Sequence, residues 1–154
     1  MLAVVTNLVG DSAPSNVDCD TTAATVNYAL DLSNTSAGNL TYVNLGNPSE
    51  LRLQQVTIET WFRRDGQGVS NTTGTGGIAQ GVPLVARGAA EAENALVDLN
   101  YFLGIDDATD TLAADFEEGA SGGSPSLNHP VYGVTTLSTG VWYHAAATYD
   151  GATW

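Results

Sequence analysis

Apolar and polar residues alternate with a period of two in several stretches of this chain, and this alternation constrains the fold more than any other feature. In residues 56–63 ("VTIETWFR"), Ile58 and Phe62 share one face of an extended strand, while Glu59 and Trp61 share the other. No segment carries a sustained 3.6-residue period, although a short helical turn is allowed at residues 89–95. We therefore predict an all-β chain folded as an antiparallel β-sandwich of the jelly-roll kind.

Further strands are expected wherever short apolar stretches are bounded by Gly, Asn and Ser. The expected segments are 1–15, 26–32, 41–46, 54–64, 95–106, 111–119, 131–137 and 141–149. Residues 107–110 ("DATD") form the predicted hairpin loop between two of them. Residues 65–81 are rich in Gly, Asn and Thr without periodicity, so we expect a long exposed loop there.

The length of the chain indicates how many domains it forms, and its net charge limits the classes of ligand that it can bind. With 154 residues and 43% hydrophobic residues, we expect a single domain over residues 1–154. The chain has 17 acidic and 4 basic residues, a net charge of −13, and no lysine. This charge disfavours nucleic acid and anionic lipid but suits polyhydroxyl ligands, cations or a salty medium. A surface rich in neutral polar residues points to an extracellular or cell-surface protein.

Two other features limit the alternatives. No apolar run approaches the roughly 18 residues that a membrane helix needs, so we expect no membrane insertion. Cys19 is the only cysteine, which excludes a disulfide within the chain, and we interpret it as an unpaired thiol whose partner, if it has one, lies outside this chain.

Two motifs carry a family resemblance. "TIETWF" (residues 57–62) and "GVWYHAAATYDG" (residues 140–151) occur in an order that resembles the laminin-G-like domain of the concanavalin A-like lectin/glucanase superfamily, also described as a pentraxin-like jelly roll. The similarity runs from Tyr28 to the last residue. It implies a concanavalin A-like sandwich, and it implies a further strand after the Asp150-Gly151 turn, which is itself a strong hairpin signal. Our hypothesis is that Trp154 begins a strand completed beyond this sequence or by β-augmentation from another chain.

Catalysis has little support in the sequence. The glucanases of this fold present Glu-x-Asp-x-Glu on a strand, and the nearest spacing here is Glu91-Ala-Glu93 outside any expected strand. Asp115 and Glu117 share a strand face, and we interpret both as solvated acids. No nucleophile motif or zinc-type spacing is present in the sequence, so we expect no enzyme activity. His129 is expected in a loop, and a hydrogen-bonded structural role is the favoured interpretation of His144.

Calcium is the one cofactor for which the sequence offers a candidate site. Asp106, Asp107 and Asp110 place three carboxylates in or beside one hairpin loop, and several branches of the similar superfamily bind this ion. Asp is also a common turn residue, and the spacing differs from that of an EF-hand, so solvated turn acids remain the alternative.

Sugar-binding sites combine aromatic faces with hydrogen-bonding side chains. The candidates are Trp61, Arg63, Tyr101, Trp142 and His144, provided that the mixed faces of their strands line the concave sheet. The alternative is that the tryptophans are buried in the core, as large aromatic residues in sandwiches usually are.

Three functions stay open at this point. The first is a non-catalytic module that binds carbohydrate or glycoprotein within a larger secreted or surface protein. The second is a structural subunit of a surface layer or filament that joins neighbouring subunits through exposed strand edges, including strand-exchange oligomers. The third is a divergent glycoside hydrolase. An exposed Trp61 or Trp142 beside hydrogen-bonding groups would favour the first, whereas a sealed face of small residues would favour the second.

Overall fold

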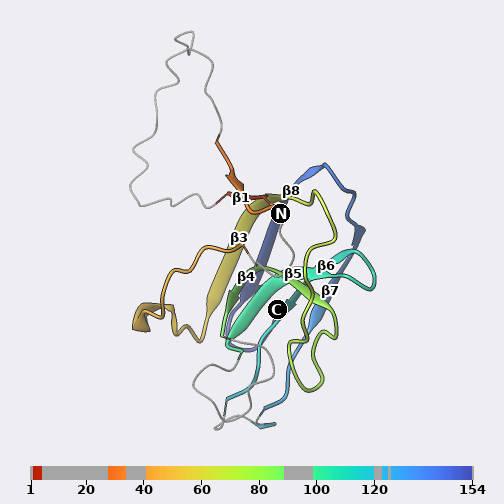
Figure 1. Cartoon of the computed structure of the whole chain (residues 1–154). Coiled ribbons are helices and arrows are strands. Elements are labelled where there is room, and N and C mark those ends of the chain that lie inside the picture. Colours follow the sequence, from red (N-terminus) through yellow and green to blue (C-terminus); the bar gives the residue numbers. More distant parts are fainter. Residues whose placement is uncertain are drawn as a thin grey trace, which may run out of the picture.

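The fold is an antiparallel sandwich of two four-stranded sheets (Figure 1). The computed structural model describes residues 2–4, 28–33, 41–88, 99–119, 123–124 and 126–153. Its elements are β1 (Leu2–Val4), β2 (Leu30–Asp31), the 3-10 helix η1 (Ser49–Leu51), β3 (Val56–Arg63), β4 (Gly81–Arg87), β5 (Tyr101–Asp106), β6 (Thr111–Asp115), β7 (Val131–Thr136) and β8 (Trp142–Tyr149). One sheet has the order β2-β1-β3-β8 and the other β4-β5-β6-β7, which confirms the all-β prediction.

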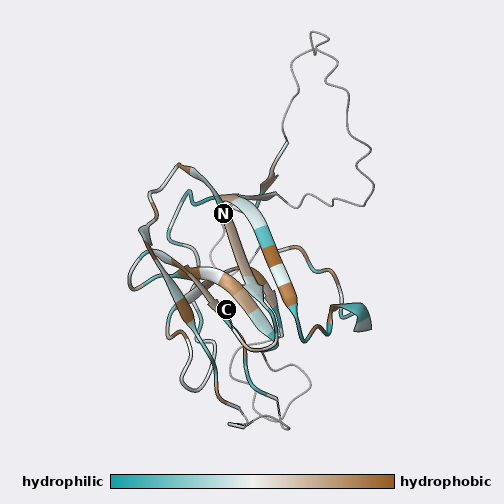
Figure 2. Cartoon of the chain, turned by 180° about the vertical axis from the view of Figure 1, so that it is seen from behind, coloured by the Kyte–Doolittle hydropathy of each residue, from teal (hydrophilic) through white to brown (hydrophobic). Residues whose placement is uncertain are grey.

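The main core lies between the sheets, and alternation along β3 explains why. Ile58 and Phe62 point inward and are 7% and 0% exposed, while their neighbours on the opposite face reach solvent. Figure 2 shows the corresponding change between hydrophobic and hydrophilic residues along this strand. Ala145 of β8 packs in the same cluster as Leu103 and Ile105 of β5. Period-two alternation therefore identified the inward face of β3 correctly.

A second, smaller core lies on the other face of the β4-β5-β6-β7 sheet, and the sequence did not predict it. Ile78 is fully buried with Phe102 and Ala113, which makes β5 buried on both faces. The expectation of an exposed loop at residues 65–81 was therefore wrong for this part, where Thr73 is also only 2% exposed. A glycine at position 77 permits the close approach, because a side chain there would collide with Thr73 and Asp115.

Other strand predictions had mixed outcomes. Strand β1 confirms a strand near the N-terminus, and it pairs with both β2 and β3. The strand expected at 41–46 was wrong, because that segment is exposed and forms no ladder. A local turn competes there: Asn44 Oδ1 accepts a 2.8 Å hydrogen bond from the amide of Gly46, whose φ is +76°.

The chain turns sharply after β8, as the Asp-Gly signal predicted. Asp150 Oδ1 accepts hydrogen bonds from the amides of Ala152 (2.8 Å) and Thr153 (2.7 Å), and Gly151 has a φ of +96°. Within the described residues β8 is an edge strand, paired with β3 on one side only. The hypothesis that Trp154 begins a strand lies outside the described residues and stays a prediction.

Candidate functional site

Strands β3 and β8 bring four of the five predicted ligand-binding residues onto one face. The register pairs Trp61 with His144 and Arg63 with Trp142. Directly opposed residues of antiparallel strands share a face, so these four side chains stand together on the outer side of the sheet, away from Phe62. We call this set of four residues the aromatic platform.

The platform is open to solvent. Trp61 is 49% exposed and Trp142 is 40% exposed, so the interpretation of both residues as buried core is wrong. The rings of Trp61 and His144 have centroids 5.1 Å apart at an interplanar angle of 42°. The guanidinium carbon of Arg63 lies 5.7 Å from the centroid of the Trp142 ring, which is within cation–π range. The four side chains therefore support one another without being covered.

Acidic residues neutralise the platform's cation. Arg63 donates two hydrogen bonds to Asp65, with Nε–Oδ1 at 2.8 Å and Nη2–Oδ2 at 2.9 Å. These hydrogen bonds hold the pKa of the Asp65 carboxyl below its usual value and raise the pKa of Arg63. Next to the platform, Glu59 Oε2 lies 3.5 Å from His144 Nε2, and both side chains are exposed. His144 is thus an exposed residue of the strand face, with the Glu59 carboxylate beside its ring.

Tyr101 lies elsewhere. It is 7% exposed and belongs to the main core on the facing sheet, so the structure does not bring it to the platform. Burial raises the pKa of its phenol. Part of Tyr101 instead lines a groove at the end of the sandwich.

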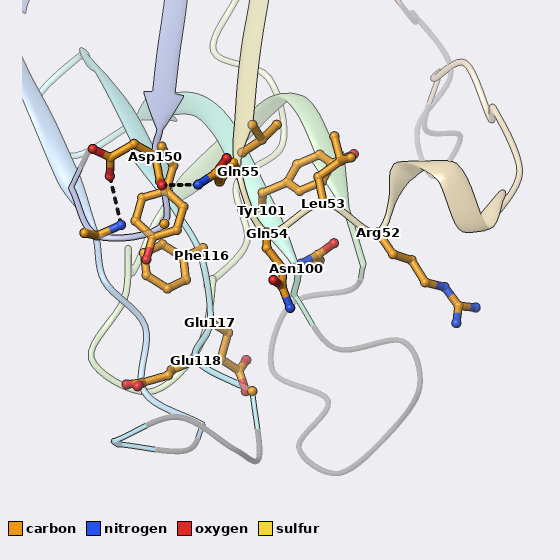
Figure 3. Close-up of a pocket in the computed structure, with 15 residues that line it drawn as sticks. Arg52, Leu53, Gln54, Gln55, Asn100, Tyr101, Phe116, Glu117, Glu118 and Asp150 are labelled. Atoms are coloured by element: carbon orange, nitrogen blue, oxygen red, sulfur yellow. Dashed lines mark hydrogen bonds between the residues drawn. The ribbon is translucent and has the colours of Figure 1, made fainter.

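This end groove has a volume of about 1070 Å³ and runs between segments 52–56, 100–101, 116–119 and 149–152. Figure 3 shows Phe116 and Asp150 on one side of it and Tyr101 on the other. The rings of Phe116 and Tyr149 lie 4.6 Å apart, and Gln55 Nε2 donates a 2.7 Å hydrogen bond to the carbonyl of Asp150. Sequence reasoning missed this groove because its walls come from four segments without a shared motif.

Three carboxylates contribute to the lining of the groove, those of Glu117, Glu118 and Asp150. Glu118 accepts hydrogen bonds from His129 Nε2 (3.1 Å) and from the amide of Ser124 (3.1 Å). These and related contacts, led by the bond with His129, hold the pKa of Glu118 below its usual value. A glycosidase acid needs a raised pKa, and the hydrogen bonds to Glu118 act in the opposite direction. His129 itself stacks on Phe116 at 4.8 Å in the segment before β7.

Asp115 corrects a sequence prediction, because it is fully buried instead of solvated. Its carboxylate accepts hydrogen bonds from the Thr73 hydroxyl, from Asn128 Nδ2 at 3.3 Å and from the amide of His129 at 2.9 Å. Burial raises its pKa, although these bonds partly oppose the shift. The Asp115 carboxylate attaches the loop of residues 70–80 to the sheet through its hydrogen bond with Thr73. Glu117 is only partly exposed, so the prediction that it is a solvated acid is also only partly correct.

The candidate calcium loop is organised around an arginine. Arg64 is 6% exposed and donates hydrogen bonds to Asp107 (Nη2–Oδ1, 2.7 Å) and to Asp110. Asp106 instead accepts a 2.7 Å hydrogen bond from the Thr109 hydroxyl. The guanidinium thus supplies the positive charge that the carboxylates require. Among the described residues no group of three or more His, Cys, Asp or Glu side chains is arranged to hold a metal ion, and calcium binding stays a prediction.

Some sequence candidates cannot be placed. Cys19 and the Glu91-Ala-Glu93 segment lie outside the described residues. Within the described part of the chain, no helix combines the length and apolar character needed to cross a bilayer.

Comparison with known proteins identifies the family. A laminin-G family model, described as "Concanavalin A-like lectin/glucanases superfamily", matches residues 37–154. Neither curated proteins nor solved structures gave a match. Laminin-G-like domains are usually extracellular and generally non-catalytic, and they bind carbohydrate or protein partners, whereas the wider superfamily also includes glycosidases. The matched region covers β3 to β8 and therefore both strands of the platform. The chain belongs to the concanavalin A-like lectin/glucanase superfamily, as a laminin-G-like domain.

Proposed function

We propose that this domain is a non-catalytic recognition module that binds carbohydrate or glycoprotein through the aromatic platform, as part of a secreted or cell-surface protein. The observation that carries the proposal is the exposure of Trp61 (49%) and Trp142 (40%) on neighbouring strands of one sheet face. Indoles bury large areas when a partner covers them, and Trp is enriched at binding interfaces. An exposed pair supported by Arg63 and His144 fits a binding surface better than a sealed packing face.

Binding to an array of glycans and glycoproteins tests this proposal. Trp61→Ala and Trp142→Ala should each weaken binding by about tenfold or more, as expected for an interface anchor. Tyr132→Ala is the matched control, because Tyr132 is a comparably exposed aromatic residue (48%) on β7 of the other sheet. Binding that survives both tryptophan substitutions, or that Tyr132→Ala abolishes equally, would refute the platform as the binding site.

Assembly through strand edges is the second candidate, and the composition of two strands favours it. β7 is exposed along its whole length, with Val134 at 97%, and neither β7 nor β8 contains Lys, Arg, Asp, Glu or Pro. Natural edge strands usually carry such residues, because they prevent unwanted pairing with another chain. Sedimentation velocity over a range of protein concentrations distinguishes the assembly function from the recognition function. Concentration-dependent oligomers that a Val134→Lys substitution disperses would support assembly. A monomer at all concentrations would contradict it.

A further inference from the structure

We infer that the ligand of the aromatic platform is an uncharged polysaccharide chain, and that anionic glycans are rejected. This inference rests on the proposed function and specifies the chemical class of its ligand. It follows from three features of the platform: the state of its arginine, the position of its carboxylate, and the open shape of the strand face.

Among the described residues, the arginine on this face is already paired with a carboxylate. All basic residues of the protein other than histidine are four arginines. Arg63 is the one on the platform, and its Nε and Nη2 donate hydrogen bonds to the two carboxylate oxygens of Asp65 in a two-point ion pair. Arg64 is buried against Asp107. Anion recognition relies on Arg or Lys whose charge is not already compensated, and Asp65 compensates the charge of Arg63, so the platform suits an anionic glycan poorly.

The two remaining arginines are also placed away from the platform. Arg87 donates hydrogen bonds to Asn100 (2.9 Å) and Asn47 (2.6 Å) on the β4–β5 side of the molecule. Arg52 belongs to the end groove, where its side chain extends outward (Figure 3). With a net charge of −13, the field over the whole surface therefore opposes an anionic polymer.

A carboxylate beside the platform suits hydroxyl groups. Glu59 stands two residues before Trp61 on the same face, and the residue opposite it on β8 is Ala146. The small alanine leaves the carboxylate uncovered, with its side chain 61% exposed. A carboxylate accepts hydrogen bonds from sugar hydroxyls but repels a second carboxylate or a sulfate. Neutral sugars are thus favoured by Glu59, and acidic sugars are disfavoured by the same residue.

The shape of the face indicates a chain rather than a single sugar. From Glu59 to Arg63 the platform and its carboxylate extend along β3 for roughly 14 Å, at about 3.4 Å per residue. These residues lie on an outward strand face and do not line the end groove. An open strip of this kind can hold the interior of a polymer laid along the strands, with the apolar faces of its sugar rings on Trp61 and Trp142.

Affinity electrophoresis with matched polymers tests the inference. The panel contains neutral β-glucan, xylan, mannan, galactan and starch, together with anionic counterparts. One matched pair shares a cellulose backbone: carboxymethyl cellulose is the anionic member and hydroxyethyl cellulose is the neutral one. We expect retardation by at least one neutral polymer, weakened about tenfold or more in Trp61→Ala and in Trp142→Ala but retained in Tyr132→Ala. We also expect no retardation by the anionic counterpart at low salt.

The outcomes separate the inference from the proposed function. Binding restricted to anionic polymers and weakened by salt would overturn the inference and leave a carbohydrate-binding function intact. Tryptophan-dependent binding to a glycoprotein that persists after its glycans are removed would likewise overturn the inference. Failure to bind any glycan or glycoprotein would overturn both. Circular dichroism of each variant verifies that it is folded before its binding is interpreted.

Discussion

Arg64 is expected to be a main electrostatic support of this fold, and its removal gives a sharp test. The residue follows β3 directly and joins the end of that strand to the hairpin loop between β5 and β6. Its side chain is 7% exposed, and that of its partner Asp107 is 8% exposed. Arg64 Nε also donates a 3.1 Å hydrogen bond to the carbonyl of Gly66. Arg64→Ala would leave the Asp107 carboxylate buried without its counter-charge.

Breaking a buried pair from one side costs about 3–5 kcal/mol of unfolding free energy. For a domain of this size each kcal/mol lowers the melting temperature by about 2–4 °C, so a decrease of roughly 6–20 °C is expected. Urea unfolding followed by circular dichroism measures the free energy directly. Arg63→Ala is the matched control, because its pair with Asp65 is exposed and should contribute far less.

A second substitution tests the cause. Asp107→Asn in the Arg64→Ala background removes the uncompensated charge, so it should restore part of the lost stability and give a positive coupling energy in a double-mutant cycle. The reasoning would be refuted if Arg64→Ala cost less than about 1 kcal/mol, or no more than Arg63→Ala.

Three further predictions concern the core and the hairpin loop. Burial raises the pKa of Asp115 in the folded state, so the stability that this carboxyl contributes is greatest below about pH 3.9 and is lost as pH rises through the folded pKa. The difference in unfolding free energy between the wild type and Asp115→Asn, measured by urea titration, should therefore fall over that pH window. A difference that does not change with pH would contradict the raised pKa of Asp115. Gly104→Ala should lower stability by about 1–3 kcal/mol, because the new methyl collides with the carbonyl of Val82, whereas Gly133→Ala meets only ordinary contacts and should cost much less in the same assay. If calcium binds the hairpin carboxylates, as the sequence predicts, it must displace the Arg64 guanidinium, and millimolar calcium should then raise the melting temperature of the wild type. An unchanged melting temperature would contradict a calcium site in this loop.

Much of the sandwich was predictable because one face of its strands is buried and the other is solvated. Alternation along β3 and β8 therefore identified the platform side of both strands. The same alternation placed Tyr101 on one strand face with Leu99, Leu103 and Ile105. Because the other residues of this face are apolar, the pattern already indicated that Tyr101 belongs to the core. Tyr101 was nonetheless included among the site candidates, as an aromatic residue on one of the strands whose mixed faces were considered.

Other features depend on contacts that a local pattern does not contain. Segment 41–46 has apolar residues, but no described strand pairs with it, so they stay exposed. Asp115 was expected in solvent because nothing nearby in sequence covers it, and the covering residue is Thr73, more than forty positions earlier. The pairing of Arg64 with Asp107 likewise joins the end of β3 to the β5–β6 hairpin loop, 43 residues later in the sequence.

The measurement that tests the central claim most directly is a titration of the isotopically labelled domain with the neutral polymer that retards it best, followed by NMR. The indole N–H signals report on the tryptophan side chains, and Trp61→Ala and Trp142→Ala assign them. We predict that the signals of Trp61 and Trp142 shift together with increasing ligand, while the side-chain amides of Gln54 and Asn100 in the end groove stay unchanged. Shifts confined to the end groove, or none at the two indoles, would contradict the account.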